Sequence, residues 1–567
     1  MSDPRHSLLL ISDFNLGPFA GYLNNDDSDP GVRVQMSEFG QVIPALLVAD
    51  AAMWDPSPDA AVVWTRPEAV LPGFADLLRF ESVEFEQLED ELASYAGALL
   101  DMASRVRFAF VPTWVLPSYQ QGHGLLDMRP NVGIAHALMR LNLRLAELLH
   151  PASNIYVLDA ARWVQAAGRN AFPPGSWYLG KIPFGNEVFK AAMASVKSAL
   201  SSLTAGARKL LVVDLDDTLW GGIVGDEGWE NLRLGGHDHV GEAYVDFQHE
   251  LRALKNRGVL LSIVSKNEES VALEAIREHP EMVLNDDDFV GWRINWQDKA
   301  ANILALVEEL NLGLQSVVFL DDSPIERARV REALPEVLVP EWPGDATRYR
   351  QALLELRVFD TPTLTDEDAR RTNMYRAERA RKAERVQLTS IDDWIESLDI
   401  RVEAARLTEP DLGRATQLLN KTNQMNLATR RMSESEFSAW AGTSGHALYT
   451  FRVSDKFGDS GLTGLLGLQT FGNTTLITDF VLSCRVMGRR VEEAMLHCAV
   501  EHARAAAAGV EHVVAGYGPT PKNVPCLAFW RRSGFDEEPE HLFRWPASKL
   551  YPLPDAVTLD RSDRAGS

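Results

Sequence analysis

Two carboxylates lie one residue apart directly after a short apolar run, Leu210–Val213, where the sequence reads Asp-Leu-Asp-Asp-Thr from Asp214 to Thr218. A carboxylate can attack phosphorus and form an aspartyl phosphate. A second carboxylate two residues further on can protonate the leaving oxygen and later activate water. The pattern therefore predicts phosphoryl transfer, with Asp214 as the nucleophile and Asp216 as the general acid and base.

The other groups that such a reaction needs follow in order along the chain. Ser265 ends an apolar run and is suited to hold a phosphoryl oxygen, and Lys299 opens a predicted helix and can balance negative charge. A hard divalent ion, which we expect to be Mg²⁺, lets an anionic carboxylate approach an anionic phosphoryl group. The predicted metal ligands are Asp214, Asp216, Asp321 and Asp322, and the predicted substrate contacts beside them are Thr218, Lys266 and Asn267.

A calcium-binding loop also begins with alternating aspartates, but the sequence excludes it. In such a loop the sixth residue is glycine and the twelfth is glutamate, whereas Leu219 and Gly225 occupy these positions here. A polar turn explains a single Asp-x-Asp-x-Thr pattern, but it does not explain the ordered set of groups that follows.

Alternating strands and helices must position these residues. Apolar runs at Leu210–Val213, 259–264 and 317–320 are separated by stretches with helical periodicity, among them 243–256 and 299–310. This alternation predicts a doubly wound parallel sheet, and such sheets bind their ligands at the carboxyl ends of the strands. Each candidate residue falls at that edge.

The same reasoning extends to the rest of the chain. We expect an α/β fold class, with two doubly wound parallel-sheet domains followed by an α+β domain. The predicted segments are an α/β domain over 1–200, the phosphotransferase domain over 205–345, a helical connector with a solvated charged face over 346–400, the α+β domain over 401–552, and a frayed tail over 553–567.

Composition and charge argue against some classes of partner and indicate the cellular compartment. The net charge is −24 over 567 residues and no long run of Lys or Arg occurs, which argues against nucleic acid or an anionic membrane as partner. Cys484, Cys498 and Cys526 are too few for a disulfide framework and have no zinc-site spacing. The apolar start at Leu8 is too short for a signal or a membrane span. We therefore expect a cytoplasmic protein.

The four phosphotransfer motifs together resemble the haloacid dehalogenase (HAD) superfamily. The loop Trp220–Gly228 is short and glycine-rich, which leaves no room for a large cap domain and predicts a site open to a bulky or protein-borne substrate. This loop and the segment Asp321-Asp322-Ser323-Pro324 resemble the FkbH-like branch. Further similar segments are 419–426, 456–461 and 483–489, so the resemblance covers about 205–550.

The resemblance implies a two-part reaction. FkbH-like proteins transfer a glyceryl unit from 1,3-bisphosphoglycerate to the thiol of an acyl carrier protein and remove the phosphate, giving glyceryl-carrier thioester for polyketide extender or starter units of the methoxymalonyl type. One alternative is a Mg²⁺-dependent phosphatase that acts on a carrier-bound or small phosphorylated acid without acyl transfer. A second alternative is a carrier-binding scaffold with vestigial sites, against which the intact motif set argues.

Acyl transfer proceeds most easily through an enzyme thiol. Some family members have a cysteine between the two motif aspartates, but Leu215 occupies that position here. Cys484 is then the candidate acyl carrier, because it lies in a family-like segment ahead of a predicted helix; the alternative is that it is a small buried residue. Cys498 and Cys526 are expected in the core or in loops.

The segment Arg485–Arg490 follows a predicted strand and precedes a predicted helix. It resembles the pyrophosphate loop of GCN5-related acetyltransferases (GNAT), in which backbone N–H groups hold coenzyme A phosphates. The last loop position is usually small but is Arg490 here, which weakens the case for coenzyme A itself. We expect instead that Arg485, Gly488 and Arg489 contact a carrier's phosphopantetheine; the alternative is a solvated basic helix start.

The N-terminal domain resembles an SGNH-type hydrolase that has lost its catalytic base. Ser12 lies where that fold places its nucleophile, but Arg162 replaces the histidine expected three residues after Asp159. Without the base Ser12 is not activated in the usual way. We therefore expect a role in assembly or carrier recognition. His237 and His239, near the predicted metal site, are expected to be surface residues.

Overall fold

The structure of the chain is a computed structural model that describes residues 6–48, 52–120, 122–204, 207–361, 370–387, 390–422, 424–506, 509–520 and 522–562. It divides into two compact units, Met1–Ala207 with Asp360–Pro362 and Arg208–Phe359 with Thr363–Ser567. Over the described ranges, no helix is long and apolar enough to cross a membrane.

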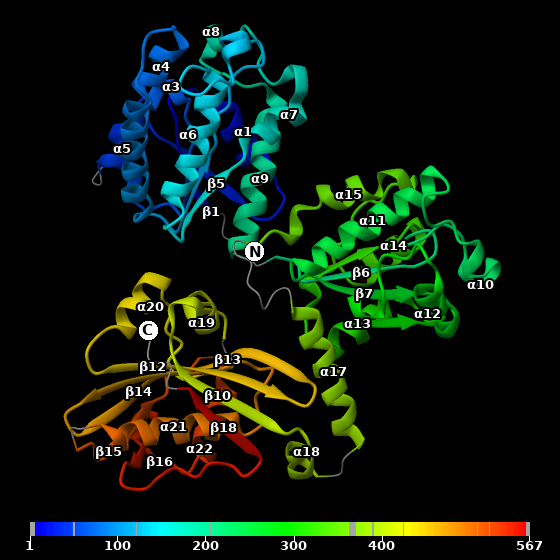
Figure 1. Cartoon of the computed structure of the whole chain (residues 1–567), viewed down its shortest axis with the longest axis vertical. Helices are drawn as coiled ribbons and strands as arrows, with labels where there is room; N and C mark the ends of the chain where they lie inside the picture. The colour runs from blue at the N-terminus through cyan, green and yellow to red at the C-terminus, as the bar shows by residue number, and fades with distance from the viewer. Residues whose placement is uncertain are drawn as a thin grey trace. The chain divides into compact units, whose positions relative to one another are not determined.

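The first unit, coloured blue to cyan in Figure 1, is built on a parallel sheet whose strand order is β2-β1-β3-β4-β5. Successive strand residues point to opposite faces, so Leu9 and Ile11 pack with α5 and α6, whereas Leu8 and Leu10 pack with α1 and α9. Burial of both faces explains the continuous apolar runs. The elements are β1 His6–Ile11, α1 Gly17–Asn25, β2 Val32–Met36, α2 Val42–Leu47, β3 Ala60–Val63, α3 Pro67–Val70, α4 Pro72–Leu78, α5 Phe85–Ala103, β4 Phe108–Pro112, α6 Ile134–Leu149, β5 Ile155–Leu158, α7 Ala160–Ala167, α8 Ser176–Gly180 and α9 Asn186–Thr204.

The second unit begins with another parallel sheet, in the order β8-β7-β6-β9. Leu211 and Val213 pack against α11 and α15 on one face, and Leu210 and Val212 pack against α13 and α14 on the other. The elements are β6 Leu210–Val213, α10 Val224–Glu227, α11 His239–Asn256, β7 Leu260–Ser265, α12 Glu269–Glu278, β8 Phe289–Ile294, α13 Lys299–Glu309, β9 Val317–Leu320, α14 Pro324–Ala333 and α15 Tyr349–Glu355.

A mixed sheet forms the rest of the second unit, with strand order β16-β17-β15-β14-β13-β12-β10-β18 and β11 beside β14. Helices α21 and α22 pack on one core of this sheet and α19 and α20 on another. The elements are α17 Arg371–Gln387, α18 Ile391–Ser397, β10 Ile400–Arg406, α19 Glu409–Lys421, β11 Met425–Asn426, α20 Glu434–Ala441, β12 His446–Asp455, β13 Gly458–Phe471, β14 Thr474–Leu482, α21 Val491–Ala505, β15 His512–Gly516, α22 Val524–Arg532, β16 Asp536–Glu538, β17 Leu542–Pro546 and β18 Val557–Ser562. The predicted fold class is confirmed.

Two predicted boundaries need correction. Helix α15 and Phe359 belong to the core around β6, because Tyr349, Leu353 and Phe359 are buried there, so the connector begins later than residue 346. The predicted tail contains β18, which pairs in parallel with β10 and buries Val557 against the sheet. Residues 563–567 of that tail lie outside the described residues.

The charged face of α17 is only partly solvated, which differs from the prediction. Arg381 is buried and its guanidinium donates to Asp455 at the end of β12, at 2.6 and 2.8 Å. Arg379 donates to the Val290 carbonyl of β8 at 2.9 Å and pairs with Glu309. The charges of this helix therefore hold it against both sheets of the second unit.

Candidate active site

Asp214 lies at the carboxyl edge of the β8-β7-β6-β9 sheet because strand β6 ends one residue before it. Its backbone N–H donates to the Leu320 carbonyl at 3.0 Å, which continues the pairing of β6 with β9. The same pairing brings the residues after β9 alongside those after β6. Asp321 and Asp322 therefore meet Asp214 at the same edge, as the sequence predicts.

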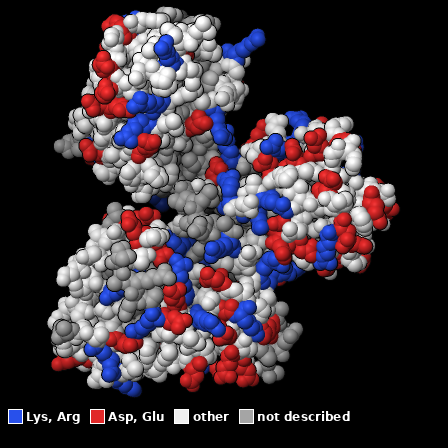
Figure 2. All heavy atoms as spheres, viewed as in Figure 1, with Lys and Arg blue, Asp and Glu red and all other residues white. Residues whose placement is uncertain are grey.

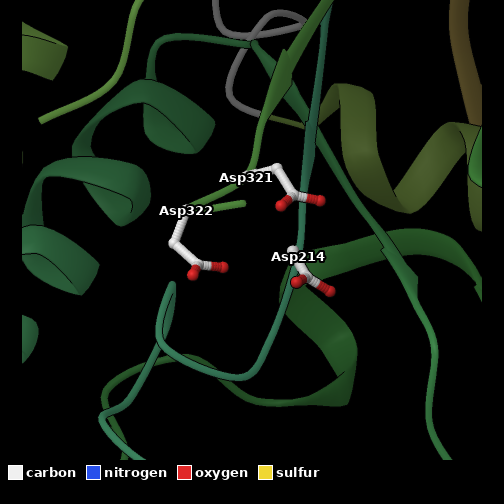
Figure 3. A group of neighbouring side chains, drawn as sticks. All are labelled: Asp214, Asp321 and Asp322. Atoms are coloured by element: carbon white, nitrogen blue, oxygen red, sulfur yellow. The ribbon is translucent and has the colours of Figure 1, made fainter. Parts of the chain in front are cut away.

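The three carboxylates form one group (Figure 3). Each offers an oxygen that lies within 4.8 Å of the others, and Asp214 and Asp321 are buried. The Asp214 Oδ1 atom is buried and has no hydrogen-bond partner within the described part of the chain. An unpartnered buried carboxylate oxygen is costly unless a cation or donor meets it.

Lys299 supplies the positive charge nearest to this group. Its Nζ atom lies 2.9 Å from Asp214 Oδ2 and 2.6 Å from Asp321 Oδ2, and the side chain is almost fully buried. Asp298 caps the start of α13 by accepting from the Ala301 N–H. This cap fixes the first turn of the helix, from which the Lys299 side chain extends. Burial alone lowers the Lys299 pKa, but the two carboxylates outweigh it and raise that pKa. Lys299 is therefore an ammonium ion here.

One ammonium does not neutralise the carboxylates. Burial, with the neighbouring Asp214 charge, raises the pKa of Asp321 to about 6. Burial and the charges of Asp214 and Asp217 also raise the pKa of Asp322. The donor set consists of hard oxygen atoms with excess negative charge and one unpartnered oxygen, and these features fit a Mg²⁺ ion. Asp214, Asp321 and Asp322 are the residues that would hold it.

Metal binding at this group predicts a thermal shift. Adding Mg²⁺ at about a hundred times its dissociation constant should stabilise the protein by about 2.7 kcal/mol, because the ion neutralises the clustered carboxylates. Asp322→Asn should remove most of that gain, as measured by differential scanning calorimetry with and without Mg²⁺. Asp226→Asn, an exposed carboxylate on α10, is the control. Equal gains in both variants would contradict the assignment.

Asp216 was predicted to bind the metal, but it does not belong to the group of three carboxylates. It lies in a separate set of hydrogen-bonded residues. Its Oδ1 accepts from Trp220 Nε1 at 3.0 Å and from the Val224 N–H at 3.1 Å, and its Oδ2 accepts from Asn267 Nδ2 at 2.9 Å. Burial raises the Asp216 pKa, and these three hydrogen bonds oppose the shift. A held carboxyl group with a raised pKa suits a proton donor. Asn267, predicted to contact substrate, positions Asp216 instead.

The remaining predicted residues lie around the same edge. Ser265 is buried, and its Oγ accepts from Asn267 Nδ2 at 3.3 Å. Thr218 is buried and its Oγ1 accepts from the Asp322 N–H at 3.2 Å, so it supports the loop after β9. Lys266 pairs with Glu326 at 2.6 Å. The structure thus places these side chains together at one edge.

Sequence reasoning missed Arg327. This buried guanidinium donates to the carbonyl oxygens of Asp321 and Asp322 at 2.8 and 2.7 Å and holds the loop that presents both carboxylates. The sequence offers only one arginine among several in α14, so nothing there distinguishes Arg327 from its exposed neighbours.

Cys484 lies in a different part of the second unit. It is exposed, which overturns the alternative of a buried residue, whereas Cys498 and Cys526 are buried as expected. It lines a cavity of about 380 Å³ with Lys209, Arg371, Arg414 and Arg485. Lys209 precedes β6 and Asp214 follows it, so five residue steps, about 16 Å of extended chain, separate the cavity end of the strand from the aspartates.

The loop before α21 does not present two of its three predicted ligands. Arg489 is buried and pairs with Glu378 at 2.6 Å and Asp455 at 3.2 Å, so its predicted carrier contact is wrong. The Gly488 N–H donates to the buried Glu492 carboxylate at 2.8 Å. The Glu492 carboxylate therefore occupies the position that an anionic ligand would need at the Gly488 N–H. The predicted carrier contact of Gly488 is also wrong. Arg485 lines the Cys484 cavity.

The first unit lacks an assembled hydrolase site at the predicted residues. Ser12 is buried and its Oγ accepts from the Phe14 N–H at 3.1 Å. Asp159 caps α7, and the exposed Arg162 pairs with it at 3.2 Å. In the second unit, His237 and His239 are exposed, as predicted.

No protein-family model matches the chain, and no curated protein matches it. Among solved structures, it is similar to the N-terminal part of protein BF1531 from Bacteroides fragilis, described as containing a phosphatase domain complexed with Mg. The identity is 26%, the TM-score is 0.57, and the match covers 64% of this chain and 95% of that chain. This likeness agrees with the predicted phosphatase-type domain.

Acetyltransferases also match over a smaller part of the chain. The ribosomal-protein-S18-alanine N-acetyltransferase from Escherichia coli is 11% identical and covers 27% of this chain and 97% of its own, with a TM-score of 0.20. The IAA acetyltransferase from Bacillus cereus is 21% identical and covers 24% and 78%, with a TM-score of 0.18. At these TM-scores no functional inference follows.

Proposed function

We propose that this chain is a Mg²⁺-dependent glyceryl transferase and phosphatase that converts 1,3-bisphosphoglycerate, an acyl carrier protein and water into glyceryl-carrier thioester and two phosphate ions. The observation that carries the proposal is the meeting of Asp214, Lys299 and a held Asp216 at one sheet edge. The likeness to a phosphatase-domain structure that contains Mg supports the same chemistry. The glyceryl unit and the carrier follow from the FkbH-like motifs.

Dephosphorylation divides into two displacements at phosphorus. In the first, an Asp214 oxygen forms a bond to phosphorus while the bond to the leaving oxygen breaks, and Asp216 donates a proton to that oxygen. In the second, Asp216 takes a proton from water, which attacks phosphorus and releases Asp214 and phosphate. Lys299 holds Asp214 in place by its 2.9 Å ion pair. When bound, Mg²⁺ supplies charge neutralisation between carboxylate and phosphoryl oxygens.

Acyl transfer is proposed to use the cavity at Cys484. The Cys484 thiolate attacks the carbonyl carbon of the acyl phosphate, phosphate leaves, and the carrier thiol then displaces the cysteine to give the carrier thioester. Cationic side chains of Arg371, Arg414 and Arg485 line this cavity, and its size suits a three-carbon phosphorylated acid. The two half-reactions then occupy opposite edges of one sheet.

A phosphatase without acyl transfer is the second candidate. Two observations favour it: Leu215 is a buried aliphatic residue between the aspartates, and Cys484 lies beyond the other end of β6. This candidate predicts phosphate release from a phosphorylated acid while the carrier stays unmodified.

Mass spectrometry of the carrier separates the candidates. The protein is mixed with carrier, Mg²⁺ and labelled 1,3-bisphosphoglycerate. A glyceryl mass increment on the carrier supports transfer; phosphate release with an unmodified carrier supports the phosphatase; absence of both overturns the enzyme proposal in favour of a scaffold.

Replacing Cys484 with Ala tests the thiol. Carrier loading should fall about a hundredfold, because the acyl group loses its covalent carrier. Hydrolysis of p-nitrophenyl phosphate should stay unchanged, since the aspartates lie at the other edge of the sheet. Unchanged loading would remove Cys484 from the mechanism.

A further inference from the structure

The cavity beside Cys484 also contains a lysine at the amino edge of the parallel sheet. The Lys209 N–H donates to the Ser316 carbonyl, and the Lys209 carbonyl accepts from the Leu260 N–H, so this residue continues the pairing of β6 with β9 and β7. Its side chain lines the cavity of about 380 Å³ together with Arg371, the first residue of α17. The sheet therefore fixes the backbone from which this ammonium group extends into the cavity.

Arg371 brings a second positive charge close to Lys209. Its Nη1 atom donates to the Gly258 carbonyl, in the turn that leads into β7, at 2.8 Å, which holds the guanidinium at the same edge of the sheet. Partial burial of the Lys209 ammonium, together with the Arg371 charge, lowers the pKa of Lys209. Among the side chains that the structure describes, none forms an ion pair with Lys209. An ammonium group in these surroundings is stabilised by a bound anion, because an opposite charge favours its charged form.

The rest of the cavity lining adds positive charge. Arg414 and Arg485 belong to it, and none of the described residues in this lining is acidic. On the face shown in Figure 2, by contrast, acidic and basic side chains are interspersed over the part of the second unit that holds β6–β9. The whole chain has a net charge of −24, so the basic lining is a local feature. A cleft lined by one sign of charge raises the local concentration of ligands of the opposite sign.

The same cavity connects Lys209 with the Cys484 thiol. Both residues line it, and Tyr375 of α17 lines it with them. Burial raises the pKa of the Tyr375 phenol, and the nearby Cys484 adds to this rise. The charges of Arg371 and Arg485 oppose the rise, so Tyr375 lies close to both arginines as well as to the thiol. An anion held at Lys209 and Arg371 therefore shares one enclosed space with Cys484.

We propose that Lys209 and Arg371 form a phosphate site, which holds the phosphate ester of a small acid while its acyl carbon lies at Cys484. This inference rests on the proposed function and adds its substrate class: the cysteine accepts acyl groups that carry a phosphate ester away from the acyl carbon. An ammonium beside a guanidinium suits the several oxygen atoms and the double charge of a phosphate ester better than it suits one carboxylate. The phosphate that is later removed at Asp214 thus selects the substrate at the acyl-transfer step.

Protection of Cys484 from alkylation tests the site. The full chain is treated with iodoacetamide in EDTA, and mass spectrometry follows the modification of Cys484, which is exposed, whereas Cys498 and Cys526 are buried. One probe is 3-phosphoglycerate, which has no acyl phosphate and so leaves the thiol unacylated; the other is glycerate, which lacks the phosphate. The concentration of 3-phosphoglycerate that halves the alkylation rate should be at least about tenfold below that of glycerate.

Substitution of Lys209 tests the assigned residue. Lys209→Gln should raise the half-protecting concentration of 3-phosphoglycerate about tenfold, measured against the ligand-free rate of the same variant, and leave that of glycerate within about twofold. Lys209→Arg keeps the charge and should stay within about threefold of the wild type. Lys549→Gln is the matched control, because Lys549 is exposed and lies over the Trp545 ring, outside the cavity lining. It should change neither value.

Several outcomes overturn the inference. Equal protection by the two probes, protection by neither, or unchanged protection in Lys209→Gln would each remove the phosphate site. A larger loss in Arg485→Gln than in Lys209→Gln would place the phosphate beside Arg485 and remove the assignment to Lys209. The comparison of the two probes on the wild-type protein needs no variant, so it decides the inference even if a substitution prevents folding.

Failure of the proposed function gives a different pattern. If the carrier is never loaded, but 3-phosphoglycerate protects Cys484 and Lys209→Gln weakens that protection, the phosphate site stands and acyl transfer falls. If the carrier is loaded, but the two probes protect Cys484 equally, the phosphate site falls and the proposed function stands.

Discussion

Replacing Asp214 with Asn is expected to lower the rate of phosphate release by about 10⁴-fold, the largest effect on activity that the structure predicts. The amide cannot form the bond to phosphorus, and it also removes one of three carboxylates suited to the metal. Lys299 keeps its contact with Asp321 at 2.6 Å, so the site retains its local order. The measurement is single-turnover phosphate release from p-nitrophenyl phosphate.

Asp217→Asn is the matched control for this variant. Asp217 lies three residues after Asp214 but is exposed, and its Oδ1 accepts from the Gly222 N–H at 2.9 Å, a contact that an asparagine oxygen reproduces. Its backbone has a φ of 51°, which asparagine tolerates. The rate should change less than about threefold. A comparable loss in both variants, or retention of activity in Asp214→Asn, would remove Asp214 from the nucleophile role.

Replacing Asp455 with Asn is expected to cost about 3–5 kcal/mol of unfolding free energy, the largest predicted effect on stability. The Asp455 side chain is 1% exposed and accepts from Arg381 at 2.6 and 2.8 Å and from Arg489 at 3.2 Å. Burial lowers the pKa of Arg489, while Glu378 and Asp455 favour its charged form. Without the Asp455 charge, Glu378 is the acidic side chain that the described residues leave to pair with the two buried guanidinium groups of Arg381 and Arg489.

Asp399→Asn controls for the loss of an acidic partner of arginine. Asp399 pairs with Arg401 at 3.3 Å, but both side chains are more than 60% exposed. Exposed pairs contribute about 0–1 kcal/mol because water and salt screen them. Calorimetric unfolding of both variants gives the comparison. If Asp455→Asn is no less stable than Asp399→Asn, the buried group does not fasten α17 to the mixed sheet.

The grouping of the aspartates and Lys299 was predictable because each of these residues lies at a strand end or at the start of a helix. A four-residue apolar run predicts strand β6, and Asp214 is the next residue whichever strands β6 pairs with. The same holds for Asp321 after β9 and for Lys299 at the start of α13. Parallel strands share one carboxyl edge, so order along the chain was enough to bring these groups together.

The roles of Asn267 and Arg327 were not predictable in this way. Asn267 reaches Asp216, 51 residues away, and Arg327 reaches carbonyl oxygens that no sequence pattern marks. Both act on neighbours through side-chain directions that packing decides. For the same reason, the sequence predicted a solvated face on α17 where the structure has a contact surface.

Sequence alone predicted the strand-end positions of Asp214 and Asp216 and the alternating strands and helices, because these depend on residue type and short-range periodicity. Tertiary structure decided which polar side chains are exposed to a ligand and which are buried with partners inside the protein. Folding buried Arg489 against Asp455, turned Glu492 onto Gly488, and placed Cys484 at a cavity beside the amino end of β6. A charged or nucleophilic residue has the same letter whether buried or exposed, and only long-range packing sets its solvation, its partners and therefore its chemistry.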